Sequence, residues 1–159
     1  MQTGTMTFPP PFKIAVVGGG IGGLFAALSL HHHCGSAVSI DVYEQAREYK
    51  EIGAGLALGP NAAKLLYKLG LGHAAMEIAG KRAGVWFTFR KFDDGDEVVT
   101  VKVPNEATVK SIPMHRAQFL DLLTDAIRAR NAATLHVNKR CQGVTVCAST
   151  TLLKTTLLR

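Results

Sequence analysis

The sequence contains little cysteine and no paired cysteine motif. Only three of its 159 residues are cysteines, at Cys34, Cys141 and Cys147. An odd number of cysteines without a C-x-x-C pair argues against both a disulfide framework and a zinc ribbon. A reducing compartment is then the default, and we predict a cytoplasmic protein.

The chain also lacks a basic cluster and a membrane-type hydrophobic run. Its formal net charge is +6, but lysine and arginine are scattered, without interleaved aromatic residues, so we predict no nucleic-acid partner. Residues 12–30 are apolar, yet five glycines interrupt them and no small-residue cleavage site follows a charged segment. We therefore expect neither a signal peptide nor a membrane anchor.

The residues that are present indicate a globular α/β protein without internal repeats. Hydrophobic residues make up 47% of the chain and charged residues 19%, which is typical of a packed domain. Three consecutive prolines favour an extended arm over residues 1–12. The pattern that follows predicts a strand, a helix and a buried strand, over 13–17, 21–33 and 37–44. This βαβ unit predicts a Rossmann-like fold with a parallel sheet.

The middle of the chain predicts further helices and one inserted β-hairpin. Helices are expected over 60–70, 73–79 and 115–130, and a third strand of the sheet over 134–139. Two alternating runs around a D-D-G-D turn predict a hairpin over 84–103. Its alternating Trp86, Phe87 and Phe89 favour a sheet face packed on a helix, with a minor role in lining a pocket left open.

The stretch IAVVGGGIGGLFAALSL has five glycines in six positions between strand-forming and helix-forming residues. In such a strand, turn and helix, Gly18 permits the tight turn and Gly20 lets a pyrophosphate approach the backbone. Gly23 lets the helix pack close to the strand. The N–H groups at the helix start then face the phosphates, so the stretch predicts a phosphate cradle.

Glu44 supplies the second feature of a dinucleotide site. It ends the second predicted strand, 21 residues after Gly23, where a carboxylate can accept hydrogen bonds from both hydroxyls of an adenosine ribose. An acid at this place also disfavours a 2′-phosphate, and therefore NADP. The alternative is a structural turn that has lost its ligand, and the loop alone does not decide between FAD and NAD.

Further motifs carry a resemblance to a known family. The segments YEQAREYKEIGAGLALGPNAAKLLYKLGL and SIPMHRAQFLDLL are similar to the N-terminal half of the FAD-dependent aromatic hydroxylases, which include salicylate hydroxylase. The resemblance covers about residues 13–140. It implies an FAD cofactor, reduction by NADH or NADPH, and hydroxylation of a small aromatic substrate by O₂.

The resemblance also implies cofactor contacts for nine residues. The pyrophosphate would lie against Gly18, Gly20, Ile21, Gly22 and Gly23. Glu44 would hold the ribose with Gln45 beside it, the backbone of Ala57 would approach the cofactor, and Arg116 would point toward the flavin side. A guanidinium suits phosphate and ribityl oxygens. The alternative is a surface arginine, which is unfavourable at a helix N-terminus.

Other polar residues are weaker candidates. The histidines at 31–33 are consecutive on a helix and so diverge, which argues against a metal site. His115 is either a base beside Arg116 or, in our preferred interpretation, a capping or surface residue. Tyr43 and Tyr49 are expected to be packing residues. We name no catalytic residue and no metal ligand.

The end of the chain departs from the family pattern. Neither the D-G motif nor the later G-D motif of the family follows residue 140. We therefore expect a C-terminally incomplete, inactive chain with three parts: the arm 1–12, a partial FAD-binding domain 13–140 and a tail 141–159. Within the domain, residues 84–103 would begin the substrate-facing sheet. The tail is expected to lack a strand partner. The alternatives are a non-catalytic adenine-dinucleotide module and, less favoured without a Tyr-x-x-x-Lys motif, a small NAD dehydrogenase. The oligomeric state is left open.

Overall fold

The computed structural model of the chain describes residues 11–49, 55–80, 85–102, 111–147 and 150–157. They divide into two compact units. One unit is Met1–Tyr49 with Leu123–Arg159, and the other is Lys50–Leu122.

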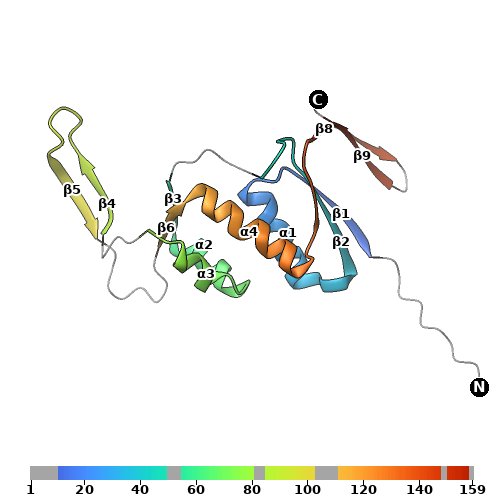
Figure 1. The fold of residues 1–159 in the computed structure, drawn as a ribbon, viewed down its shortest axis with the longest axis horizontal. Coiled ribbons are helices and arrows are strands. Elements are labelled where there is room, and N and C mark those ends of the chain that lie inside the picture. The colour runs from blue at the N-terminus through green and yellow to red at the C-terminus, as the bar shows by residue number, and fades with distance from the viewer. Residues whose placement is uncertain (1–10, 50–54, 81–84, 103–110, 148–149, 158–159) are drawn as a thin grey trace, which may run out of the picture. The chain divides into compact units, whose positions relative to one another are not determined.

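The first unit contains the predicted βαβ arrangement (Figure 1). Strand β1 (Phe12–Val17) leads into helix α1 (Ile21–Cys34), a 3₁₀ turn (Gly35–Ala37) and strand β2 (Val38–Tyr43). Strands β1 and β2 are parallel, and β7 (Thr134–His136) adds to β2 in parallel, which gives the order β1-β2-β7. The predicted α/β class and parallel sheet are confirmed.

The core of this unit is formed by apolar side chains of α1, β2 and the second half of α4 (Arg116–Arg130). Leu24 and Leu28 share one face of α1 because they are four residues apart. The helix ends at Gly35, whose positive φ of 53° is accessible to glycine. The buried apolar residues of the unit are Leu24, Ala27, Leu28, Ile40, Val42, Leu123, Ala126, Ile127 and Ala132.

The second unit combines helices with two antiparallel strand pairs, one of them the predicted hairpin. Helix α2 (Pro60–Lys68) falls within its predicted range, α3 (Gly72–Glu77) begins one residue before the predicted 73–79, and α4 begins in this unit. Strand β3 (Gly55–Leu58) pairs antiparallel with β6 (Ile112–His115), a pair that the sequence pattern does not predict. Each strand has four residues, and one contains a proline, so neither gives a clear alternation.

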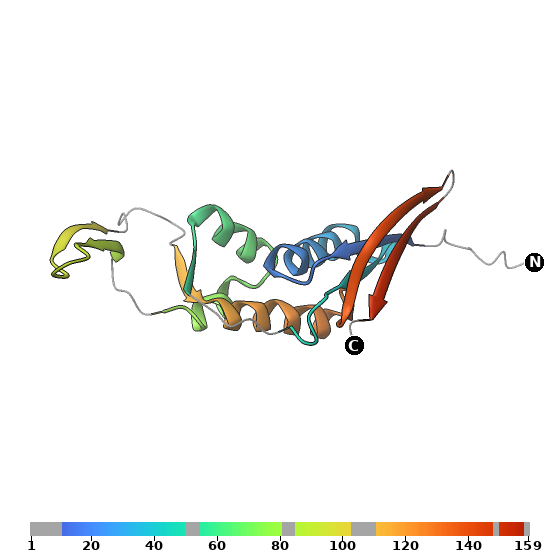
Figure 2. The same ribbon diagram turned by 90° about the horizontal axis from the view of Figure 1, so that it is seen from above.

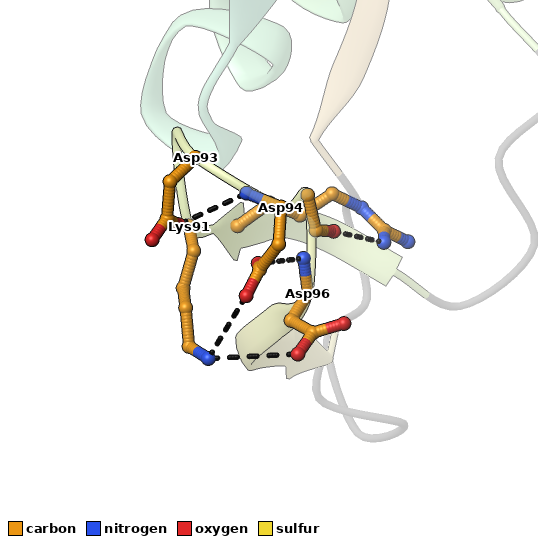
Figure 3. A network of polar contacts seen from close by, with 6 residues as sticks. Lys91, Asp93, Asp94 and Asp96 are labelled. Atoms are coloured by element: carbon orange, nitrogen blue, oxygen red, sulfur yellow. Dashed lines mark hydrogen bonds and ion pairs between the residues drawn. The ribbon is translucent and has the colours of Figure 1, made fainter.

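The predicted hairpin is present as β4 (Val85–Arg90) and β5 (Glu97–Lys102). Its tip is closed by polar contacts, in which the Lys91 ammonium lies 3.3 Å from Asp94 and 3.5 Å from Asp96 (Figure 3). The expectation that its aromatic face packs on a helix is wrong for Phe87 and Phe89, which are 37% and 55% exposed. Their rings contact each other edge to face, with centroids 5.1 Å apart. A two-stranded hairpin has no second layer of structure that could bury this face. The side chain of Trp86 lies outside the described residues.

The C-terminal residues differ from the expected unpaired tail. Strands β8 (Lys139–Cys147) and β9 (Thr150–Leu157) form an antiparallel pair, coloured red in Figure 2. The expectation that residues 141–159 lack a strand partner is therefore wrong. The threonine and leucine run has high β-propensity, and it satisfies its backbone by pairing with the preceding strand.

The described ranges bear on two function classes, membrane proteins and metalloproteins. None of the helices in those ranges has the length and hydropathy needed to cross a membrane. Histidine, cysteine and acidic side chains in the same ranges form no group of three that could hold a metal ion. The histidines at 31–33 occupy the last turn of α1.

Candidate nucleotide-binding site

The glycine loop between β1 and α1 begins with a turn that glycine makes possible. Gly18 has a φ of +104°, a backbone conformation that other residues rarely adopt. Its N–H donates to the carbonyl of Tyr43 at 2.8 Å, at the end of β2. The loop therefore starts at the carboxyl edge of the sheet.

Gly23 allows the helix to approach this turn closely. A Cβ atom placed on Gly23 would overlap the carbonyl oxygen of Gly18 and lie 3.2 Å from Cγ1 of Val16. The carbonyl belongs to the backbone and cannot rotate away. The close approach of α1 to the end of β1 thus depends on the missing side chain at this position.

Gly20 borders open space at the positive end of α1. It is the N-cap residue, with φ −72° and ψ −179°, and a Cβ atom added to it would meet nothing within 4 Å. No side chain caps this end, and the first turn has no acidic residue. The first N–H groups of a helix have no intrahelical acceptor, and the helix dipole favours an anion beside them. The loop has the shape and polarity of a phosphate cradle.

Glu44 follows the last residue of β2 and is tied to the glycine loop. Its Oε2 accepts a hydrogen bond from the N–H of Gly19 at 2.7 Å, and its Oε1 accepts one from the N–H of Ala46 at 2.8 Å. Its own N–H donates to the carbonyl of His136, and its carbonyl accepts from the N–H of Lys139, both at 2.8 Å. These four contacts fix both the backbone and the carboxylate of Glu44.

The turn that supports Glu44 comes from a distant part of the sequence. Asn138 adopts a φ of 55°, and its N–H donates to the carbonyl of Ala46 at 2.7 Å. Asparagine tolerates this left-handed conformation better than most residues. Sequence reasoning missed this turn because the strand predicted over 134–139 includes Asn138, whereas β7 ends at His136.

Seven of the nine predicted contact residues lie in the first unit and two in the second. Gln45 is exposed beside Glu44. Ala57 lies on β3, and the half-buried Arg116 is the first residue of α4. Gly55 pairs with His115, so β3 runs beside the strand that leads into Arg116. Residues 51–54 of the E-I-G-A-G-L motif lie outside the described residues.

Tyr43 contacts neighbouring side chains of the sheet, and His115 lies on the surface. The ring of Tyr43 stacks on His136, with centroids 4.7 Å apart, and Nε2 of His136 lies 2.7 Å from Asp41. Burial, and next the Asp41 carboxylate, raise the pKa of Tyr43. His115 is exposed.

A surface cavity of about 430 Å³ lies at the other end of the sheet. It is bordered by the first residues of β2 and β7 and by the C-terminal ends of α1 and α4. None of the nine predicted contact residues lines it. The candidate site is therefore the open loop edge and not this cavity.

Comparison with characterised proteins gives several related sequences, although no family model matches the chain. Salicylate hydroxylase from Pseudomonas putida is 37% identical over 119 residues, which are 72% of this chain and 26% of that enzyme. The 6-methylsalicylate 1-monooxygenase of Aspergillus terreus is 38% identical over 144 residues, 85% of this chain and 31% of that enzyme. The chain thus spans about a quarter to a third of the length of these relatives.

Solved structures agree with this relationship. A salicylate hydroxylase substrate complex aligns with a TM-score of 0.67 and 26% identity, covering 92% of this chain and 32% of that one. CtdE in complex with FAD aligns with a TM-score of 0.70 and 18% identity, covering 91% of this chain and 34% of that one, which supports the fold. The resemblance seen in the sequence is confirmed, and the chain is homologous to part of the FAD-dependent aromatic hydroxylases, the monooxygenases that include salicylate hydroxylase.

Proposed function

We propose that the first unit binds the adenosine diphosphate part of FAD, with the glycine loop on the pyrophosphate and Glu44 on the ribose. The observation that carries this proposal is the 2.7 Å hydrogen bond from the Gly19 N–H to the Glu44 carboxylate. This hydrogen bond joins the predicted phosphate cradle to Glu44, the acid predicted to bind the ribose. The two parts form one site at the carboxyl edge of a parallel sheet, where dinucleotides bind.

The pyrophosphate contact rests on the N-terminus of α1. Open space at Gly20 gives a phosphate room to reach the backbone. The N–H groups of Ile21, Gly22 and Gly23 would then donate to phosphate oxygens, and the helix dipole would favour their negative charge. Gly18 contributes the turn that directs these groups outward from the strand.

The ribose contact rests on the lone pairs that Glu44 has left. An ionised carboxylate offers about four acceptor positions. The amides of Gly19 and Ala46 occupy one on each oxygen. The remaining positions match the two hydroxyl donors of a ribose, and Gln45 is exposed beside them.

For the reaction of the whole protein, we propose hydroxylation of a small aromatic acid, with NADH or NADPH as reductant. FAD supplies the electron transfer and oxygen chemistry when bound, and the described residues of the first unit hold its adenosine end. The named relatives act on salicylate and 6-methylsalicylate. Because the chain spans about a quarter to a third of those enzymes, we do not propose that these 159 residues hydroxylate a substrate by themselves.

Calorimetric titration with ADP tests the ribose contact. Glu44→Gln keeps the size of the side chain but removes its charge, and we expect ADP affinity to fall by about 10- to 100-fold, the value of losing charge-assisted hydrogen bonds. Glu77→Gln is the matched control, because Glu77 is an exposed acid at the end of α3. Equal ADP affinity in Glu44→Gln and Glu77→Gln would contradict the proposal.

A pair of helix-capping glycines tests the phosphate contact. Gly20 caps α1 and Gly59 caps α2, both with extended backbone and with no atom within 4 Å of an added Cβ. Valine fits this conformation at either place, so both variants are expected to fold. Gly20→Val fills the space proposed for phosphate and should lower ADP affinity at least about tenfold, whereas Gly59→Val should not.

A further inference from the structure

Tyr49 packs against the part of the site that joins the loop to the carboxylate. A Cβ atom placed on Gly19 would overlap Cε1 of the Tyr49 ring and lie 2.9 Å from Cβ of Glu44. Gly19 itself is buried and has no positive φ, so its backbone does not require glycine. The ring of Tyr49 makes the severest overlap with a side chain at position 19, and Cβ of Glu44 makes a second, smaller one.

We propose that Tyr49 is a positioning residue for ribose recognition: its ring occupies the side-chain space of Gly19 and holds the Gly19 amide against the Glu44 carboxylate. The inference rests on the proposed function, because the carboxylate is taken to accept the ribose hydroxyls. The contact fixes one oxygen of Glu44 on Gly19, while Ala46 fixes the other. With both oxygens held, their free lone pairs keep a constant direction.

The Tyr49 hydroxyl takes no part in this role. The oxygen is buried and has no hydrogen-bond partner among the described residues. Burial, followed by the Glu44 carboxylate, raises the pKa of Tyr49 to about 12, and Arg128 acts in the opposite direction. The phenol is therefore neutral at ordinary pH, and the ring rather than the hydroxyl makes the contact.

The test compares ADP with 2′-deoxy-ADP by calorimetry. The wild-type chain should prefer ADP about tenfold or more, the loss expected for one charge-assisted hydrogen bond. Tyr49→Phe keeps the ring and should keep this ratio, whereas Tyr49→Ala should reduce it to about threefold or less because the carboxylate is no longer held. General destabilisation lowers the affinity for both nucleotides equally and leaves the ratio unchanged. If Tyr49→Ala does not fold, Tyr49→Leu serves the same purpose.

A double substitution tests the steric part independently. Gly19→Ala should weaken ADP binding about tenfold in the wild-type background but only about threefold in Tyr49→Ala. In that background the overlapping ring is gone and the 2.9 Å contact with Cβ of Glu44 remains. Equal losses in the two backgrounds would overturn the proposal.

The outcomes separate this inference from the function on which it rests. A wild-type chain that binds ADP and 2′-deoxy-ADP equally would contradict the ribose contact itself. A wild-type preference that Tyr49→Ala fully retains would overturn the role of Tyr49 and leave the nucleotide site intact.

Discussion

Gly22 and Gly23 are adjacent in the first turn of α1, but alanine should have opposite effects on stability at the two positions. A Cβ atom at Gly22 would meet nothing within 4 Å. Alanine there reduces the entropy of the unfolded chain and favours the helix, by about 0.5–1 kcal/mol. We therefore expect Gly22→Ala to raise the free energy of unfolding.

At Gly23 the same substitution meets the fixed carbonyl of Gly18 and, at 3.2 Å, the Val16 side chain. Overpacking costs about 1–3 kcal/mol, and a backbone obstacle places the cost near the upper end. After the helix-propensity gain, the net loss is about 2 kcal/mol. The two variants should thus differ by nearly 3 kcal/mol, or roughly 6–12 °C in Tm for a chain of this size.

Thermal and urea unfolding followed by circular dichroism measure this difference directly. Wild type should lie between Gly22→Ala and Gly23→Ala. A Gly23→Ala chain as stable as Gly22→Ala would refute the argument that α1 approaches β1 through the missing side chain at position 23.

The remaining predictions concern the supporting turn, the flavin side and activity. In urea unfolding, Asn138→Ala should lower the free energy of unfolding by roughly 1 kcal/mol, the cost of a left-handed conformation at alanine, while Asn138→Gly should stay near wild type. Equal effects of the two substitutions would contradict a cost of the left-handed backbone at this position. Arg116→Ala should weaken FAD binding but not ADP binding, which titration with both ligands would show; parallel losses would argue against a flavin-side contact. Incubation of the 159-residue chain with FAD, NADH and salicylate should yield no hydroxylated product by mass spectrometry, and stoichiometric product would contradict this expectation.

Much of the first unit could be predicted because its information is local. The β-branched run before Gly18, the glycine spacing and the apolar face of α1 are neighbours in sequence, and β1, α1 and β2 follow that pattern closely. The position of Glu44 at the end of β2 is predictable for the same reason. The pattern does not show what fixes the backbone of Glu44, because the supporting turn lies more than 90 residues later.

Long-range and short-strand features could not be predicted. Strands β3 and β6 have four residues each and are joined by pairing between distant segments, so neither gives a periodic signal of its own. The family pattern does not indicate the β8 and β9 pair, although the β-propensity of the threonine and leucine residues favours it. In β4 and β5 the alternation of apolar and polar residues predicts the strands correctly. It does not show whether another element covers their apolar face, which is exposed at Phe87 and Phe89.

A titration of the ¹⁵N-labelled chain with ADP, followed by amide chemical shifts, tests the nucleotide site most directly. The glycine loop and the Glu44 turn are in hydrogen-bond contact, so one ligand should perturb both. We predict the largest shifts at the amides of Gly19, Gly20, Gly22 and Gly23 and at Ala46, saturating together at one affinity. Saturable shifts confined to the cavity at the opposite end of the sheet, around His31 and Thr134, would contradict the account.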